Sequence, residues 1–232
     1  MKIKKALSMV MLSASLLSFV GCGNGQDSNS VVQNNNNSMT ENQNSEKIQQ
    51  LEIKDSGWTV VDDEWLYYYV DLYNPNDNSS IEYPSFRITA KDASGTILGT
   101  DDQTCSIIYP KQDFVYGSQA FRVDGIPDTV EFSALPVEDY NVKKSSTDKY
   151  KPLEAVNTAV RSDKIVGEIK NDNNDTFDDA VVVMLLKDGS GNVVGIDNTY
   201  VEKVAANSTT PFDIDIPEDV NYASFEIYVN QW

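Results

Sequence analysis

Apolar and polar residues alternate in short runs along the chain from Leu51 to the C-terminal Trp232. Clusters of Asn, Asp, Pro and Gly separate the runs, and these residues favour turns. Successive side chains of a strand point to opposite faces of a sheet, so this alternation predicts strands with one face on a core. No run keeps a helical period beyond two turns. The pattern therefore predicts an all-β protein built from antiparallel sheets.

One hairpin sequence occurs twice. Residues 91–99 read KDASGTILG and residues 187–195 read KDGSGNVVG, with lysine, aspartate, serine and two glycines at matching positions. In each, the aspartate can accept hydrogen bonds from turn amides, and the glycine after the serine can adopt a positive φ without a Cβ clash. The flanking strands also match, since VDLYNPN at 70–76 corresponds to GEIKNDN at 167–173. We therefore expect two copies of one β-domain.

The repeat divides the chain into five segments. Residues 1–21 are predicted to be a signal peptide, because lysines precede an apolar run that is too short to span a membrane. Residues 22–50 are rich in Asn, Gln and Ser and are predicted to be a disordered tether. Two tandem immunoglobulin-like antiparallel β-sandwich domains are expected at 51–140 and 153–232, joined by the polar linker 141–152.

The end of the predicted signal peptide carries a further motif. The sequence SFVGC, which ends at Cys22, resembles the lipobox of bacterial lipoproteins, with Phe19 where that family prefers leucine. The resemblance implies cleavage before Cys22 and transfer of a diacylglycerol to its thiol, so that acyl chains such as palmitate hold the protein at a membrane. An ordinary signal peptide followed by an unrelated cysteine is the alternative. We expect an extracytoplasmic protein, lipid-anchored to the bacterial cell membrane.

Both repeats also resemble the FxLYD-type repeat of bacterial surface lipoproteins. The motif positions are ITAKD (88–92) and MLLKD (184–188), in which Leu186 and both aspartates match the family pattern. The phenylalanine and the tyrosine of that pattern are replaced in both copies, whereas Gly167 and Asn171 match an earlier turn of the family in the second copy. The resemblance implies an immunoglobulin-like sandwich and no catalytic activity.

Pairing the copies separates the two faces of one strand. Tyr68, Val70 and Leu72 align with Ile165, Gly167 and Ile169, so this face is expected to lie on the core. The opposite face carries a row of aromatic side chains in the first copy only, namely Trp65, Tyr67, Tyr69 and Tyr73. This aromatic row is a candidate binding surface for a glycan or a peptide. Ordinary packing of tyrosines between neighbouring strands is the alternative.

The next strand shows a second difference between the copies. Its core-facing residues are Phe86, Ile88 and Ala90 in the first copy and Val182, Met184 and Leu186 in the second. Its outer face is Ser85, Arg87 and Thr89 in the first copy, but Val181, Val183 and Leu185 in the second. An apolar outer face predicts burial against the other domain, against a second chain, or under the domain's own long loops.

Charge and composition limit the chemistry that we expect. The chain has 18 Lys and Arg against 36 Asp and Glu, a net charge of −18, and no histidine. Nucleic-acid binding needs clustered cations, so no nucleic-acid partner is expected. Histidine is the commonest general base and transition-metal ligand. Paired carboxylates such as Asp101 and Asp102 point to opposite faces of a strand, so we expect neither an enzyme nor a cofactor.

Two further features could carry chemistry. The loop NDNNDTFDD (171–179) offers Asp172, Asn174 and Asp178 as weak calcium ligands, and a solvated turn is the alternative. Cys105 is the single cysteine left once Cys22 is acylated, and its place in an apolar strand predicts a buried, inert thiol.

The sequence therefore predicts a lipid-anchored cell-surface protein with a non-catalytic binding or scaffolding role. Its expected partners are the membrane, through Cys22, and an unidentified surface glycan, peptide or envelope protein. The alternative is an accessory subunit of an envelope transporter or of a cell-wall complex. The ligand, any calcium dependence, the oligomeric state and the packing of the two domains do not follow from the sequence.

Overall fold

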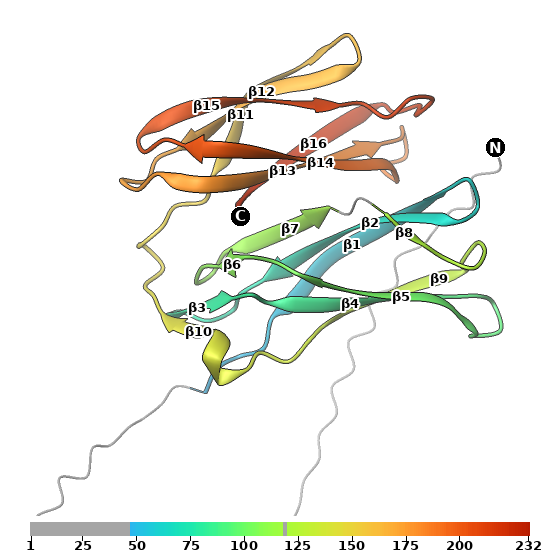
Figure 1. Cartoon of the computed structure of the whole chain (residues 1–232), viewed down its shortest axis with the longest axis horizontal. Helices are drawn as coiled ribbons and strands as arrows, with labels where there is room; N and C mark the ends of the chain where they lie inside the picture. The colour runs from blue at the N-terminus through green and yellow to red at the C-terminus, as the bar shows by residue number, and fades with distance from the viewer. Residues whose placement is uncertain (1–46, 118–119) are drawn as a thin grey trace, which may run out of the picture. The chain divides into compact units, whose positions relative to one another are not determined.

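The computed structural model describes residues 47–117 and 120–232 (Figure 1). The predicted signal peptide, Cys22 and most of the predicted tether lie outside the described residues. The described part is all-β, as predicted, and its single helical element is the short 3-10 turn η1 (Asp139–Asn141). In this part of the chain no helix is both long enough and apolar enough to cross a membrane.

The first copy is a sandwich of two main sheets. One sheet holds β1 (Glu52–Val61), β2 (Trp65–Tyr73), β7 (Asp113–Gly117) and β8 (Phe121–Arg122), and the other has the order β5 (Ile97–Thr104), β4 (Ser85–Lys91), β9 (Thr129–Ala134). A smaller sheet at one end contains β10 (Val142–Lys144), β3 (Ser79–Glu82) and β6 (Ile107–Ile108). Strand β10 lies inside the segment predicted as a linker, so the first sandwich continues to Lys144.

The second copy repeats this topology. One sheet has the order β11 (Glu154–Arg161), β12 (Lys164–Asn171), β15 (Ser208–Asp215), and the other β14 (Val193–Val204), β13 (Phe177–Lys187), β16 (Ser224–Gln231). The first sheet matches β1-β2-β7 and the second matches β5-β4-β9, with every neighbouring pair antiparallel. The predicted fold class, two tandem antiparallel sandwiches, is confirmed.

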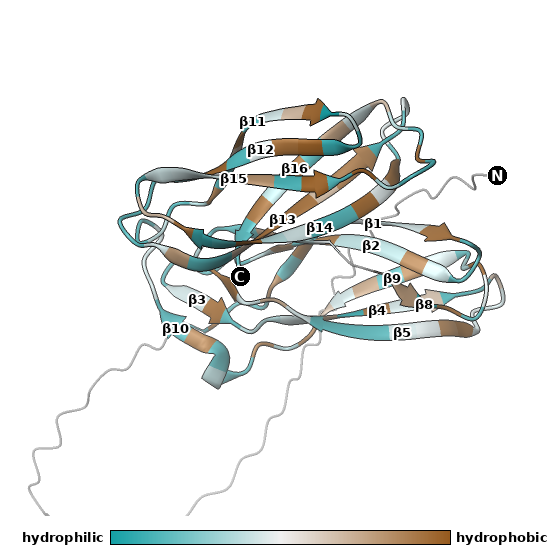
Figure 2. Cartoon of the chain, turned by 45° about the horizontal axis from the view of Figure 1, so that its top comes forward, coloured by the Kyte–Doolittle hydropathy of each residue, from teal (hydrophilic) through white to brown (hydrophobic). Residues whose placement is uncertain are grey.

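The core faces are those that the paired sequences predict. The side chains of Tyr68, Val70 and Leu72 are buried in the first copy, as are those of Ile165 and Ile169 in the second. The predicted core residues of β4 and β13 are also fully buried, and Figure 2 shows the apolar segments of β12 and β13 in brown. Alternation along the strands, together with the alignment of the two copies at β13, is thus sufficient to assign these faces.

The twin hairpins have the same hydrogen bonds. Oδ1 of Asp92 accepts bonds from the backbone amides of Ser94 (2.8 Å) and Thr96 (2.9 Å), and Asp188 accepts the two corresponding bonds at the same distances. The glycines of the two turns have φ of +86° and +82°, where a Cβ would be strained. Turn geometry therefore accounts for the shared sequence.

A pair of buried asparagines organises the loop after β12. Nδ2 of Asn171 donates to the carbonyls of Asp175 (2.9 Å) and Val204 (3.1 Å), and its Oδ1 accepts from the backbone amide of Asn173 (2.9 Å). Asn173 in turn exchanges two bonds with the backbone of Lys151, of 2.7 and 2.9 Å. This pair fixes the chain just before the first strand of the second sandwich.

The first copy has the same arrangement. Asn74 bonds the carbonyls of Ser79 (2.8 Å) and Ile108 (2.9 Å), and Asn76 exchanges two bonds of 2.9 Å with the backbone of Gln49. Ile48 packs against the hydrophobic core. Residues 48–50 therefore belong to the folded body, a correction to the predicted tether at its last positions.

We predict that Asn171→Ala lowers the free energy of unfolding by about 2–4 kcal/mol, because it leaves buried carbonyls and the Asn173 amide without their partner. Urea unfolding followed by circular dichroism measures this loss. The control Asn174→Ala changes an exposed residue of the same loop and should stay within about 0.5 kcal/mol of the wild type. Equal losses in the two variants would contradict the role given to Asn171.

Candidate functional site

Only part of the aromatic row on the outer face of β2 is exposed to solvent. Trp65 is 42% exposed, and Tyr67 and Tyr73 are half-buried. Tyr69 is only 7% exposed. The prediction of a continuous solvent-facing row is therefore wrong at Tyr69.

Tyr69 is covered from two sides. Its ring lies across Gly57 on β1, where a methyl group in place of the glycine hydrogen would come within 2.5 Å of Cε1, and its hydroxyl donates to Oδ2 of Asp55 at 2.8 Å. Burial raises the pKa of Tyr69, with smaller contributions from Asp55 and from Tyr228 and Glu226 of β16. The last two residues belong to the second sandwich, so the second sandwich covers this part of the row.

The covering surface is the apolar outer face of β13 and β14. Val181, Val183, Leu185 and Ile196 are buried, and they share one hydrophobic cluster with the core of the first sandwich. The core of the second sandwich forms a separate cluster. The sequence left three alternatives for this apolar face: the other domain, a second chain or the domain's own loops. In the structure it packs against the other domain. We call the surface between β1-β2-β7 and β14-β13-β16 the seam.

Gly117 marks a point of close approach in the seam. A Cβ at this position would lie 2.4 Å from Cγ1 of Val183, so a larger residue cannot fit while Val183 stays in place. The carbonyl of Gly117 also accepts a bond of 2.7 Å from Nδ2 of Asn198 on β14. The seam is thus closely packed and hydrogen-bonded at the same point.

A side-chain amide joins the edge of the first sandwich to the second. Oδ1 of Asn230 on β16 accepts from the backbone amide of Val115 (3.2 Å), and its Nδ2 donates to the carbonyl of Val115 (2.9 Å). Strand β7 pairs with β2 on its other side. Asn230 therefore takes the place of a further strand along this edge, which would otherwise offer unpaired backbone groups.

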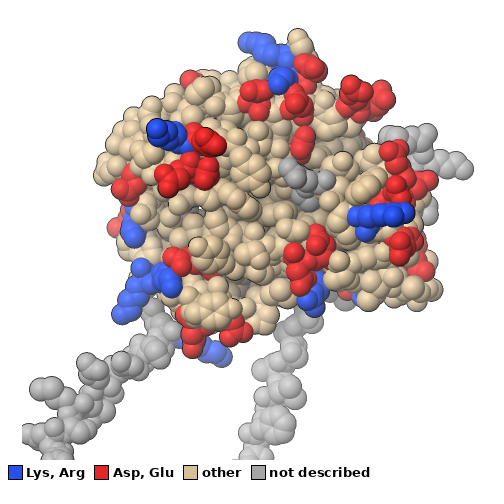
Figure 3. All heavy atoms as spheres, in the orientation of Figure 1, with Lys and Arg blue, Asp and Glu red and all other residues tan. Residues whose placement is uncertain are grey.

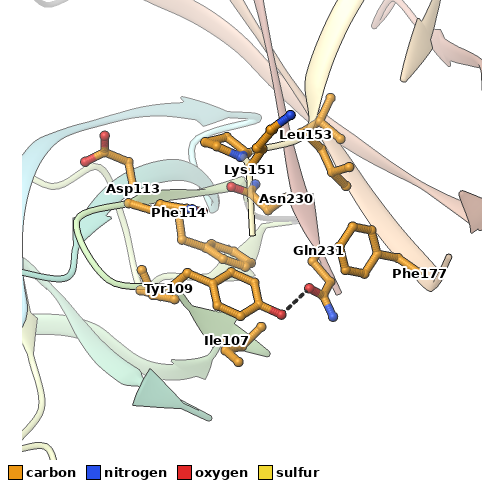
Figure 4. A pocket seen from close by; sticks show the side chains of 13 residues that line it. Ile107, Tyr109, Asp113, Phe114, Lys151, Leu153, Phe177, Asn230 and Gln231 are labelled. Carbon is orange, nitrogen blue, oxygen red and sulfur yellow. Dashed lines mark hydrogen bonds between the residues drawn. The ribbon is translucent and has the colours of Figure 1, made fainter. Parts of the chain in front are cut away.

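The seam ends in a small polar and aromatic cavity (Figure 4). The Tyr109 hydroxyl points to Gln231 and donates to its Oε1 at 2.6 Å, while Phe114, Leu153 and Phe177 surround them. The cavity holds about 40 Å³. Small-molecule sites usually measure about 300–1,000 Å³, whereas a few tens of cubic ångströms accommodate water. This cavity is part of the seam and not a ligand pocket.

Ionisable side chains lie beside the seam on the first sandwich. A register shift between Ile53 and Asp55 places Lys54 at a β-bulge, and its Nζ lies 2.6 Å from Oδ1 of Asp113 and 3.6 Å from the ring centroid of Tyr73. Asp71 is flanked by Asp55 on β1, and burial followed by the charge of Asp113 raises the pKa of Asp71 to about 6. On the face shown in Figure 3, acidic side chains are scattered, several with a Lys or Arg beside them.

The three calcium candidates make separate contacts. The Asp172 carboxylate binds Nζ of Lys170, Asn174 accepts a 3.3 Å bond from Asn207, and Asp178 lies exposed on β13. Among the described residues, no group of three or more His, Cys, Asp or Glu side chains could hold a metal ion. The buried asparagine pair organises this loop instead.

Cys105 is buried, as predicted, with 1% of its surface exposed. Burial raises the pKa of its thiol, and a thiol in that form is a poor nucleophile. Cys22, the predicted lipidation site, lies outside the described residues.

Pairing the two copies in the sequence predicts both halves of the seam, the aromatic row and the apolar face of β13, as separate features. It missed Gly117, Asn198 and Asn230, which complete the contact. The register gives Asp213 as the counterpart of Gly117 and Asp102 as the counterpart of Asn198 in the other copy. Differences between the copies at these outward positions were the available signal.

Comparison with known proteins assigns no family. No family model matches the chain, and no curated protein matches it. Among solved structures, red sea bream transglutaminase is similar at 9% sequence identity and a TM-score of 0.25, over 80% of this chain and 30% of that protein. The chain thus spans less than a third of the length of that protein. Similarity at this level carries no argument about fold or activity.

We predict that Gly117→Leu opens the seam, because the added side chain overlaps Val183. Overpacking of this kind costs about 1–3 kcal/mol. Urea unfolding measures the loss, and faster hydrogen exchange at the Val115 amide locates it at the seam.

Two variants control this experiment. A Cβ added at Gly189 would meet no atom within 4 Å, so Gly189→Leu should leave both readouts unchanged. Adding Val183→Ala to Gly117→Leu should recover part of the loss. If the Val115 amide stayed as protected in Gly117→Leu as in the wild type, the described packing would be wrong.

Proposed function

We propose that this chain is a lipid-anchored cell-surface protein whose two sandwiches serve a non-catalytic binding or scaffolding role. The lipobox-like sequence ending at Cys22 supports the anchor, and residues 23–47 separate that cysteine from the folded body. The acyl chains of a modified cysteine bind a bilayer through the area of their buried CH₂ groups.

The observation that carries the scaffolding role is the seam. A buried apolar contact, reinforced by the Asn230–Val115 and Asn198–Gly117 hydrogen bonds, joins two domains that sequence alone would leave independently mobile. A body joined in this way presents surfaces on both sandwiches at a fixed relative geometry. Fixed geometry lowers the entropic cost of binding one extended partner through both domains.

The remaining part of the aromatic row is the candidate contact surface. Trp65 stands next to Val61 in the register of β1 and β2, and both side chains are exposed. The ring of Tyr73 is half-buried under the Lys54 ammonium. Rings with polar edges of this kind stack on sugars or on peptide side chains.

We predict that the wild-type protein, expressed in a bacterial host with its own signal sequence, fractionates with membranes and incorporates labelled fatty acid. Cys22→Ser should lose both properties while the folded body keeps its melting temperature. Fatty-acid labelling that persisted in Cys22→Ser would remove the anchor from the proposal.

The same preparations test binding. Envelope extract and purified cell-wall glycans are passed over wild-type protein and over the triple variant Trp65→Ala, Tyr67→Ala, Tyr73→Ala, with Tyr140→Ala as an exposed control on η1. Loss of a captured glycan or protein in the triple variant alone supports this surface. Capture of a transporter or cell-wall enzyme would favour the accessory-subunit alternative, and unchanged capture by the triple variant would rule out the aromatic surface.

A further inference from the structure

One carboxylate at the seam has a buried oxygen with no hydrogen-bond donor. Asp71 lies on the outer face of β2, in register with Asp55 of β1 and Val115 of β7. Val115 is the residue that Asn230 of the second sandwich binds through both backbone groups. Oδ1 of Asp71 is buried and has no hydrogen-bond partner.

The donors around Asp71 are engaged by other carboxylates. Lys54 binds Asp113 at 2.6 Å, the Tyr69 hydroxyl donates to Asp55 at 2.8 Å, and the Tyr228 hydroxyl donates to Oε2 of Glu226 at 2.8 Å. Lys187 is also paired with Glu226, at 2.6 Å. The cations and hydroxyls on both sides of the seam therefore stabilise other charges.

The charged form of Asp71 is disfavoured by this environment. Its carboxylate interacts with Asp55 and Lys54 on β1, with Asp113 on β7, and with Tyr228 on β16. Burial contributes most to the raised pKa of Asp71, followed by repulsion from Asp113, and the charge of Lys54 offsets part of both. A protonated carboxyl would remove the repulsion and could donate a hydrogen bond to a neighbouring carboxylate.

We propose that Asp71 makes the seam sensitive to pH, with the two sandwiches held more tightly when Asp71 is protonated than when it is charged. This inference concerns how the body is held together and does not depend on the anchor or on the binding surface. Its consequence is that mild acidity favours the closed arrangement of the two domains.

The direction follows from linkage. The pKa of Asp71 is about 6 in the closed seam against an ordinary value of 3.8. Asp55, Lys54 and Asp113 belong to the first sandwich and stay beside Asp71 when the seam opens, so opening relieves only the burial that the second sandwich adds. The pKa in the open seam therefore lies between these two values, and the closed form binds more protons. The stability of the seam is then highest below about pH 4, falls as the pH rises, and levels off above about pH 6. Opening of the seam should therefore increase between pH 5 and pH 7, by no more than about tenfold.

Hydrogen exchange of the Val115 amide tests this inference, because that amide is bound across the seam. Its exchange rate, corrected for the intrinsic pH dependence, is measured from pH 4.5 to 7.5 in wild-type protein and in Asp71→Asn. We expect the opening equilibrium to rise several-fold with pH in the wild type and to stay flat in Asp71→Asn.

Two further variants make the result specific. Asp197 is another carboxyl whose pKa burial raises, but it lies on β14 and is not among the groups facing Asp71, so Asp197→Asn should keep the wild-type profile. Asp113→Asn removes a repulsion from Asp71 and should move the midpoint of the pH dependence of seam opening to lower pH. This test holds even if Asp71→Asn does not fold. A flat wild-type profile, or a full pH response in folded Asp71→Asn, would overturn the inference.

Discussion

The arrangement of this protein depends on the need to cover one apolar surface. Strand β13 is apolar on both faces, because Val182, Met184 and Leu186 lie in the core of its own sandwich and Val181, Val183 and Leu185 point away from it. Burial of apolar area is worth roughly 25 cal/mol per Å², so such a face is not stable in water. The sheet β1-β2-β7 of the first sandwich covers this face, and the two domains then form one body.

The seam also explains why the two copies differ where they do. Val183, Asn198 and Tyr228 are neighbours on the outer face of the second sandwich, and the equivalent positions in the first are Arg87, Asp102 and Ser133. There the Arg87 guanidinium binds Asp102 through two bonds of 2.6 Å in solvent. This polar surface is unsuited to covering a third sandwich.

The exposed sheet of the second sandwich, β11-β12-β15, differs from the seam sheet of the first. Asp213 replaces Gly117 and Pro211 replaces Val115, which removes the space and the backbone amide that the seam uses.

Local rules explain the parts of the fold that the sequence predicts. Strand alternation identifies the core faces of β2, β4 and β12, and the alignment of the two copies identifies that of β13. The Asp-x-Ser-Gly hairpins follow from turn chemistry alone. The same rules miss contacts that depend on both domains at once. Alternation correctly predicts that Tyr69 points away from the core of its own sandwich. It cannot predict that Tyr228 and Glu226, more than 150 positions away in the chain, lie close to this side chain. The sequence around Asn230 does not distinguish it from an ordinary surface asparagine, because its partner, the edge of β7, lies in the other domain. The calcium-like spacing of Asp172, Asn174 and Asp178 has a local explanation, since the neighbouring Asn171 and Asn173 bind backbone groups and direct the loop.

The central claim is that the seam holds both sandwiches at one fixed orientation. Residual dipolar couplings of the folded body (residues 48–232) in a weakly aligning medium test it most directly. One alignment tensor should fit the amide couplings of the strands of both sandwiches together, with the orientation described here. Tensors that differ in magnitude or direction between the first and the second sandwich would show that the domains move independently, and that result would contradict the account.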